Sequence, residues 1–251
     1  MVYQDINQVG PVKSGPVPMI AIVQGKLGRY TSFELSMDKL RSYNVRVTGT
    51  YFSSTRSTGL NPAEGRNNAA RTLLANPAVD CVVFFDDDHE FDSDTVLRLC
   101  AMLHSGWDLA APLIVKVEPP FQSVAWQRID GKLVPFVPWG KSGVHEMDEI
   151  GTGILAVKRR VFETVPAPWF QLGQLDGHPD YMGEDVFFAR AARAAGFRIG
   201  LDVNFPAGHT APFTITPDVA NGVIRISTLS GKAMELPIAA LGEGTNAAVT
   251  D

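Results

Sequence analysis

Short apolar runs alternate with amphipathic stretches over the first 114 residues of the chain. The apolar runs predict strands at 18–25, 81–85 and 108–114, and an alternating stretch predicts a further strand at 45–51. The stretches between them carry apolar residues at helical spacing, which predicts helices over 31–43, 61–76 and 93–106. Such an alternation is typical of a mostly parallel sheet that is covered by helices on both faces.

Residues at the ends of these predicted helices support the same interpretation. Asn61 and Pro62 occupy the start positions of the second helix. Thr31 or Ser32 is the expected N-cap of the first helix, and Ser93 is the expected N-cap of the third. Gly106 lies just past the end of the third helix, where a glycine commonly ends one.

Beyond residue 114 the pattern changes to short alternating pieces that are separated by Pro and Gly. Antiparallel strands and long loops are expected over 115–149, with a hairpin at 129–132, followed by a strand and short helix over 151–165. A helix and a strand are expected over 183–202, and a hairpin beyond 216. We therefore divide the chain into an N-terminal arm (1–17), an α/β domain (18–215), and a hairpin and tail (216–251) that pack on or extend from the same domain.

Composition limits the classes of protein that fit this pattern. With 251 residues, 45% of them apolar and 20% charged, the chain is long enough to bury a sizeable core. Its net charge of −5 provides no overall basic field for nucleic acid. Cys81 and Cys100 lie in apolar segments and are expected to be packed thiols. No apolar run approaches the roughly 20 residues of a membrane span, and the first residues lack an apolar signal region, so we expect a cytoplasmic protein.

A run of acidic residues follows the third predicted strand: Asp86, Asp87 and Asp88. In sheets of this kind ligands bind beyond the carboxyl ends of the strands, where this run lies. On a strand Asp86 and Asp88 point to the same side, so they can hold one divalent cation, Mn²⁺ or Mg²⁺. A solvated turn, or an acidic flank of the next helix, is the alternative. An EF-hand is excluded because the loop lacks the required glycine and closing glutamate.

Four other features carry chemistry that could complete such a site. Glu184 and Asp185 open a predicted helix, where they are either ordinary first-turn acids or a general base facing a pocket. His209 follows a strand and a glycine, and a neutral imidazole is an acceptable third ligand for Mn²⁺. The glycines of the segment 151–153 permit close backbone approach. Three roles are open for Arg66: it is a plain surface residue, it contacts a phosphate, or it supports the acidic loop.

Taken in order, these pieces resemble the GT-A-fold glycosyltransferases, close to the large family 2 type and to related phage and bacterial proteins. The segment EGRNNAARTLLANPAVDCVVFFDDDHEFDSDTVLRL resembles the family's Arg-Asn helix leading to a strand that ends in Asp-x-Asp. GTGILAVKRRVFE resembles its glycine loop, GEDVFFARAARAAGFRIGLD resembles its x-Glu-Asp helix, and His209 resembles its C-terminal histidine. The matches cover residues 18 to about 210.

The resemblance implies a Rossmann-like GT-A catalytic domain over 18–215. It also implies transfer of a sugar from a nucleotide-sugar donor to a hydroxyl acceptor, with a UDP-sugar as the favoured donor. It implies a metal on Asp86, Asp88 and His209, and in inverting members a base matching Asp185. Glu184 would bind donor sugar or acceptor. Donor contacts fall on the residues Gln24, Arg66, Asp87, Gly151, Thr152 and Gly153. If the chain is encoded by a phage, the expected compartment is the host cytoplasm.

The acceptor is not specified by the sequence. Candidates are a protein, a glycan, a small molecule or, less favoured by the acidic balance, a modified nucleic-acid base. Segments 115–149 and 166–182, rich in Trp, Pro and Gly, are where acceptor choice is expected. Aromatic rings such as those of Trp126, Trp139 and Trp169 either pack or stack on sugars. A homo-oligomer is compatible with the sequence, which does not determine whether the chain associates with itself.

Two departures from the family pattern leave alternatives open. The segment 50–57 has no acid of the kind that binds uracil at the end of the second strand, so the donor base is not fixed. The Gln-x-x-Arg-Trp motif of processive synthases is missing, which favours a non-processive enzyme. A nucleotidyltransferase acting on sugar phosphates, a haloacid-dehalogenase-type phosphatase and an inactive sugar- or nucleotide-binding protein are the rivals. The phosphatase fits poorly, because its nucleophile follows the first strand.

Overall fold

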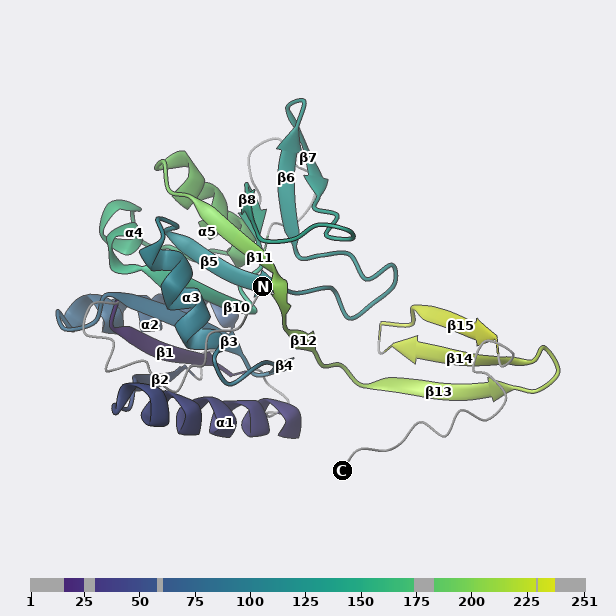
Figure 1. Cartoon of the computed structure of the whole chain (residues 1–251). Coiled ribbons are helices and arrows are strands. Elements are labelled where there is room, and N and C mark those ends of the chain that lie inside the picture. The colour runs from purple at the N-terminus through teal and green to yellow at the C-terminus, as the bar shows by residue number, and fades with distance from the viewer. Residues whose placement is uncertain (1–15, 25–29, 58–60, 174–182, 229, 238–251) are drawn as a thin grey trace.

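The computed structural model describes residues 16–24, 30–57, 61–173, 183–228 and 230–237. Within this part of the chain, a seven-stranded sheet forms the centre of the molecule (Figure 1). Its strands, in spatial order, are β2 (Ser53–Ser57), β1 (Pro18–Val23), β3 (Cys81–Asp86), β10 (Ile154–Lys158), β5 (Leu109–Leu113), β11 (Ile199–Pro206) and β8 (Val144–Met147). All of these except β10 and β8 run in the same direction, which confirms a mostly parallel sheet.

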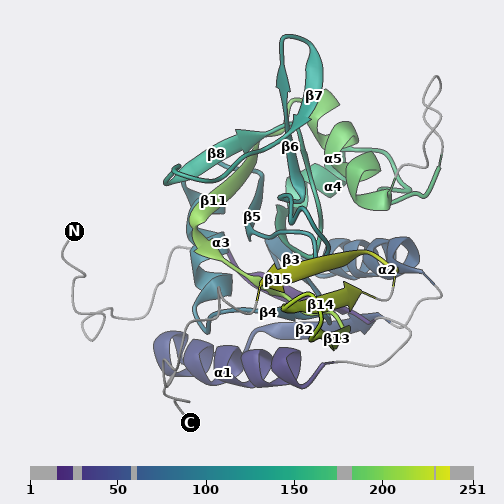
Figure 2. The same cartoon turned by 90° about the vertical axis from the view of Figure 1, so that its right-hand side faces the viewer.

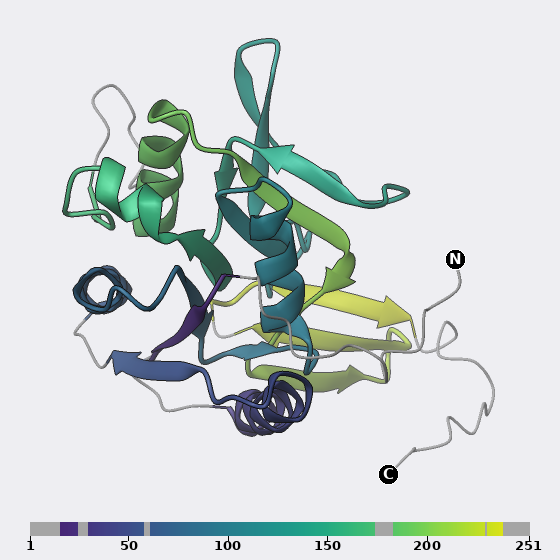
Figure 3. The ribbon, with the colours of Figure 1, turned by 60° about the vertical axis from the view of Figure 1, so that its left-hand side comes forward.

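Helices cover both faces of this sheet, as the alternating pattern predicts (Figure 3). On one face, apolar side chains of α1 (Thr31–Thr48) and α3 (Thr95–His104) pack against the sheet. On the other face lie α2 (Pro62–Ala75), α4 (Arg159–Thr164) and α5 (Glu184–Ala194). Strand β3 serves both cores, because Val82 and Phe84 point to one side while Val83 and Phe85 point to the other.

Small antiparallel sheets complete the described part. The hairpin of β6 (Ala125–Ile129) and β7 (Lys132–Pro135), joined to β9 (Glu149–Ile150), confirms the antiparallel region expected over 115–149. Its turn residues Asp130 and Gly131 both have positive φ, as a two-residue hairpin turn requires. The strands β4 (His89–Glu90) and β12 (Gly208–His209) form a short ribbon.

Three further strands follow the α/β body: β13 (Phe213–Asp218), β14 (Val223–Thr228) and β15 (Ala233–Pro237). They form a separate antiparallel sheet, here called the C-terminal sheet, that extends away from the body (Figures 1 and 2). The expected hairpin is β14 and β15. The sheet's first strand begins three residues before position 216, at which the sequence was divided. Residues 238–251 and most of the arm 1–17 lie outside the described residues.

The strand predicted over 45–51 is wrong. Helix α1 continues through this segment to Thr48 and ends at Gly49, whose left-handed φ of 70° places its N–H on the carbonyl of Val45. The strand lies one step later, as β2, whose sequence SSTRS is polar because the strand occupies the outer edge of the sheet. The alternating valines of 45–47 are half-buried helix positions instead.

Two predicted helix caps also differ from the structure. Helix α1 starts at Thr31 with Tyr30 as its N-cap, and α3 starts at Thr95 with Asp94, and neither cap residue forms a side-chain cap bond. The cap of α2 is confirmed: the Asn61 side chain accepts a hydrogen bond from the Glu64 N–H at 2.8 Å.

Candidate active site

The acidic run turns back on itself at the end of β3. The strand ends at Asp86, the next two residues form a turn, and β4 begins at His89. Strand β4 pairs with β12 in a register that places His209 opposite His89. The two imidazole rings stack, with their centroids 4.5 Å apart and their planes 18° apart. Two histidines that are distant in sequence therefore lie side by side at the carboxyl end of a central strand.

With these histidines, Asp88 completes a group of three side chains that could ligate a metal ion. Its Oδ1 lies 2.7 Å from Nδ1 of His89, and its Oδ2 lies 3.5 Å from Nε2 of His209. One ligand atom from each of the three residues lies within 4.8 Å of the others. The backbone carbonyl of Asp88 also accepts the N–H of Thr210 at 2.7 Å, which ties the turn to β12. A carboxylate and two imidazoles converge here as they would around one divalent cation.

The hydrogen bonding of this group fits a bound cation. His89 is only 2% exposed, yet neither of its ring nitrogens has a hydrogen-bond partner within the described residues, and the same holds for Oδ1 of Asp88. Their 2.7 Å approach is not aligned as a hydrogen bond. Buried polar atoms are rarely left in this state. His209, in contrast, has a partner for one ring nitrogen: its Nδ1 lies 3.1 Å from the carbonyl of Val115 and donates a hydrogen bond to it. Its Nε2 then carries the lone pair that could bind a metal.

The glycine loop 151–153 packs directly against His89. A Cβ atom on Gly153 would lie 2.5 Å from Nε2 of this histidine, so only glycine fits beside the ring. The carbonyl of Gly153 accepts the N–H of Asp86 at 2.8 Å, and the N–H of Gly151 donates to Val124 at 2.7 Å. Thr152 is buried between them. The loop thus supports the end of β3 and the histidine that follows it.

Arg66 joins the acidic run to the start of α5. Its guanidinium is almost fully buried, and Nη2 lies 2.7 Å from each carboxylate oxygen of Asp86. Its Nη1 donates to Oε1 of Glu184, which belongs to the first turn of α5. Of the roles considered for Arg66, the structure shows support of the acidic loop. Because one cation holds both carboxylates, the end of β3 and the start of α5 are fixed relative to each other.

Asp185 follows Glu184 in the first turn of α5 and lies in a partly desolvated position. Burial raises the pKa of its carboxyl, and the neighbouring Glu184 carboxylate adds to this rise. One carboxylate oxygen accepts the N–H of Val186 at 2.7 Å. A Cβ atom on Gly183 would lie 2.5 Å from that same oxygen, so this glycine leaves the room that the carboxylate occupies.

The two outer aspartates of the run have opposite pKa shifts. Burial raises the pKa of Asp86 to about 6, although Arg66 opposes the rise. Burial also acts to raise the pKa of Asp88, but the imidazoles of His209 and His89 outweigh it and hold that pKa well below its usual range. The carboxylate of Asp88 raises the pKa of His209 in return, against the effect of burial. Asp88 is therefore the carboxylate that stays ionised beside the histidines.

The structure brings together some of the predicted site residues and adds one. Asp88 and His209 lie in the three-residue group, whereas Asp86 is bound by Arg66. His89, which the sequence analysis did not select as a candidate ligand, occupies the third position. A two-residue ribbon is too short to give an alternating pattern, so no signal pointed to it beyond the turn-forming aspartates before it.

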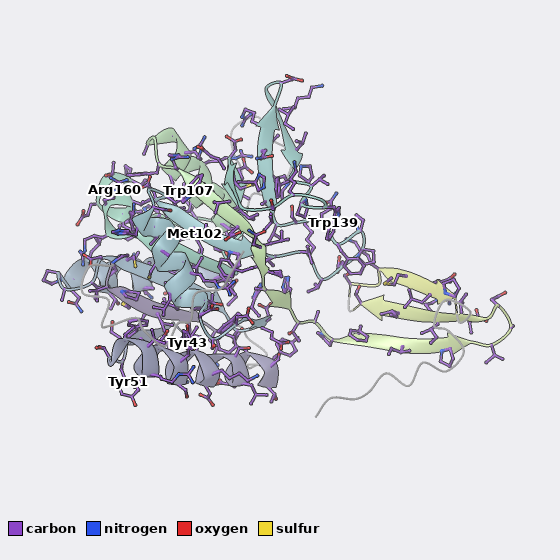
Figure 4. All side chains as sticks on the ribbon, in the orientation of Figure 1. Tyr43, Tyr51, Met102, Trp107, Trp139 and Arg160 are labelled. Carbon is purple, nitrogen blue, oxygen red and sulfur yellow. The ribbon has the colours of Figure 1, made fainter. Side chains whose placement is uncertain are left out.

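The other predicted donor contacts lie near the same edge of the sheet. Gln24 is half-buried directly after β1, and Asp87 is buried, with its carbonyl accepting the N–H of Tyr30. Two of the tryptophans considered for sugar stacking have different environments. Trp169 is buried and donates through Nε1 to two backbone carbonyls, whereas Trp139 is 71% exposed on the loop beyond β7 (Figure 4). Trp139 therefore keeps the option of stacking on a ligand, and Trp169 is a packing residue.

A surface depression of about 510 Å³ lies away from this group, against α1. It is lined by Asp38, Lys39, Ser42, Tyr43, Arg46 and Ser93. None of these residues belongs to the predicted site, and the depression is broadly open to solvent, so we do not assign it the chemistry of the histidine pair.

Neither a protein-family model nor a curated protein sequence matches this chain. Solved structures do. A197 from STIV matches with a TM-score of 0.54 and 14% identity, over 86% of this chain and 93% of that chain. GalNAc-T7, solved with UDP, GalNAc and Mn²⁺, matches with a TM-score of 0.50 and 13% identity, over 77% of this chain. This chain spans only 43% of that protein.

These likenesses define the fold. The mixed α/β architecture, with a mostly parallel central sheet, flanking helices and small antiparallel sheets, is a GT-A-like fold. No helix in the described part of the chain is both long and apolar enough to span a bilayer.

Proposed function

We propose that the chain is a metal-dependent, non-processive glycosyltransferase that moves a sugar from a nucleotide-sugar donor to a hydroxyl acceptor. The favoured donor is a UDP-sugar. The observation that carries this proposal is the pairing of His89 and His209 beside Asp88, linked through Arg66 to the first turn of α5. The three candidate metal ligands and the carboxylates of Glu184 and Asp185 thus lie at one edge of a GT-A-like sheet. Support also comes from GalNAc-T7, which carries UDP and Mn²⁺ on a similar fold.

The ligand set favours Mn²⁺ over Mg²⁺ and suits a diphosphate. Mg²⁺ prefers oxygen ligands, whereas two of the three groups here are imidazoles. One carboxylate and two neutral imidazoles leave a divalent ion with net positive charge for the donor phosphates. When bound, the ion neutralises the charge that builds on the leaving nucleoside diphosphate. Asp88 contributes the charge, while the Val115 carbonyl orients His209 by accepting its Nδ1 proton.

Asp185 is the residue to which we assign proton removal from the acceptor hydroxyl. Its raised pKa brings its basicity closer to neutral pH, which improves general-base catalysis. Glu184 is oriented by Arg66 and is assigned to hydroxyls of the donor sugar or acceptor. Both terminal nitrogens of Arg66 are bound by the two carboxylates, so we assign it to positioning instead of phosphate binding. Gln24, Asp87 and the loop 151–153 stay as proposed donor contacts.

The test measures binding and turnover separately. Calorimetric titration of the purified chain with Mn²⁺ and then UDP should show UDP binding that requires the metal. A panel of nucleotide sugars, followed by chromatography of the released nucleotide, should identify a donor that is hydrolysed. Asp88→Asn should lose metal-dependent UDP binding, while Asp185→Asn should keep binding and lose turnover. Asp38→Asn, at an exposed position of α1, is the matched control.

Four outcomes would count against the proposal. UDP binding that survives chelation would contradict the metal group. A full rate in Asp185→Asn would contradict the base. Consumption of a nucleoside triphosphate with a sugar phosphate, but of no nucleotide sugar, would favour the nucleotidyltransferase. Binding of a donor without any turnover would indicate an inactive sugar- or nucleotide-binding protein.

A further inference from the structure

The C-terminal sheet sorts its side chains into two unlike faces. The register pairs Ile215 with Ile226 and Ile226 with Met234, so these side chains point to the same side. The alternation of the strands extends this face, here called the apolar face, to Phe213, Ile215, Pro217, Ile224, Ile226, Met234 and Leu236, with Thr228 as its one polar residue. The opposite face carries Thr214, Thr216, Asp218, Ser227 and the ion pair of Arg225 with Glu235, together with the apolar residues Val223, Ala233 and Pro237. A sheet with this division is built to cover one face and solvate the other.

The apolar face has no cover within the described part of the chain. Each of its seven apolar side chains is exposed or half-buried, and Phe213 and Ile215 are 59% and 58% exposed. Figure 1 shows the sheet extending beyond the body, with no helix over either face. Its polar contacts to the body come from the β14–β15 turn, where Lys232 lies 2.7 Å from Glu118. Exposed apolar patches of this kind commonly mark interaction sites.

We propose that the apolar face docks onto the same face of a second copy of this chain, so that two C-terminal sheets form a sandwich about a twofold axis. The face contains no charged residue, so two copies meet without leaving a charge unpaired. An identical patch on both partners is what a twofold interface requires. The sheet extends beyond the α/β body, which leaves its faces accessible to a second chain (Figure 1).

Pairing through the strand edges is the less suitable alternative. The outer strands β13 and β15 contain Pro217 and Pro237, which lack an N–H donor. Prolines are among the devices that keep edge strands from recruiting another strand. The face therefore remains as the open surface for association.

The size of the face sets the strength of the association. Strands β13 and β14 have six residues each, so the sheet is about 20 Å long and, with three strands, about 14 Å wide. Each copy thus contributes about 280 Å² in projection, before the relief of the side chains is counted. Standard stable interfaces bury about 800 Å² of accessible surface on each partner. We therefore expect a dimer in equilibrium with monomer, which dissociates on dilution.

The experiment is analytical ultracentrifugation of the full chain from low micromolar to several hundred micromolar. The wild type should shift from the monomer mass toward the dimer mass over this range. Ile215→Glu should stay monomeric at the highest concentration, since a charge would be buried in the sandwich. Thr214→Glu, the neighbouring position on the opposite face, should associate like the wild type. Phe213→Gln is a second, milder test on the apolar face, and thermal melting checks that every variant folds.

Several results would overturn the proposal. They are a wild type that stays monomeric throughout, an Ile215→Glu variant that associates as the wild type does, or loss of association in Thr214→Glu. Binding of a monomeric wild type to phosphatidylcholine vesicles would assign the face to a lipid surface instead. The proposal is independent of the proposed enzymatic activity, because it concerns a different part of the chain and a different measurement.

Discussion

A single methyl group on Gly153 provides a sharp test of the histidine pair. The Cβ of Gly153→Ala would lie 2.5 Å from Nε2 and 2.6 Å from Cε1 of His89, and ordinary van der Waals contact begins at 3.4 Å. The ring must therefore move by about 0.9 Å, whereas metal–ligand distances tolerate only about 0.2 Å. Because His89 is 2% exposed, the surrounding protein limits the directions in which it can move.

We expect Gly153→Ala to weaken Mn²⁺ binding by about 10- to 100-fold, the range seen when groups that orient a metal ligand are disturbed. Isothermal titration with Mn²⁺ alone measures this loss without any donor. Gly151→Ala is the matched control: its new Cβ would lie 3.2 Å from the side chain of Val124, a contact that relaxes by a few tenths of an ångström. That variant should keep the Mn²⁺ affinity of the wild type.

The result that refutes this reasoning is a folded Gly153→Ala protein that binds Mn²⁺ as tightly as the wild type. Circular dichroism and the melting temperature establish that the variant is folded. If the variant does not fold, His89→Ala is the second test, since it removes the imidazole instead of displacing it. Unchanged Mn²⁺ affinity in His89→Ala would equally exclude this histidine from the metal site.

The remaining predictions concern the supports of the site. Arg66→Ala leaves its two bound carboxylates without a cation and should lower the free energy of unfolding in urea by about 3 kcal/mol; unchanged stability would show that the ion pairs contribute nothing. Asn67→Ala removes three hydrogen bonds to the backbone of the loop before residue 173 and should cost about 2–3 kcal/mol, whereas Asn68→Ala, at the helix surface, should cost less than about 0.5 kcal/mol. The raised pKa of Asp185 predicts a turnover rate that falls as pH drops through a value above the ordinary aspartate pKa of about 4, because the base must be deprotonated; an acid limb at or below about 4 would contradict it.

The central strands could be predicted from the sequence because their burial leaves a direct signal. β1 and β3 are buried on both faces and read as continuous apolar runs. β2 could not be found in this way, since an exposed edge strand has no need of apolar residues. The place of β10 was also hidden: it lies antiparallel between β3 and β5, and nothing local in its sequence specifies which strands it separates.

The candidate site shows the same limit at the scale of single residues. Asp88 and His209 were found because each follows a predicted strand, the position at which such sheets bind ligands. His89 was not, since its place depends on a turn and a two-residue pairing with β12. The tie between Arg66 and Glu184 joins residues 118 positions apart, which is a contact that only the assembled layers create.

The acidic run now resolves into two carboxylates with separate tasks, although they have the same chemistry and lie two positions apart. Asp86 points to the buried guanidinium of Arg66, and its desolvation raises its pKa to about 6, so it is ionised at neutral pH while that cation is present. Asp88 points to two imidazoles that hold its pKa far lower. Carboxylates whose surroundings push their pKa values apart commonly divide their roles. Asp86 therefore positions α5 through Arg66, and Asp88 keeps its charge beside the two histidines, where the metal is proposed to bind. The spacing of a strand alone does not reveal this division.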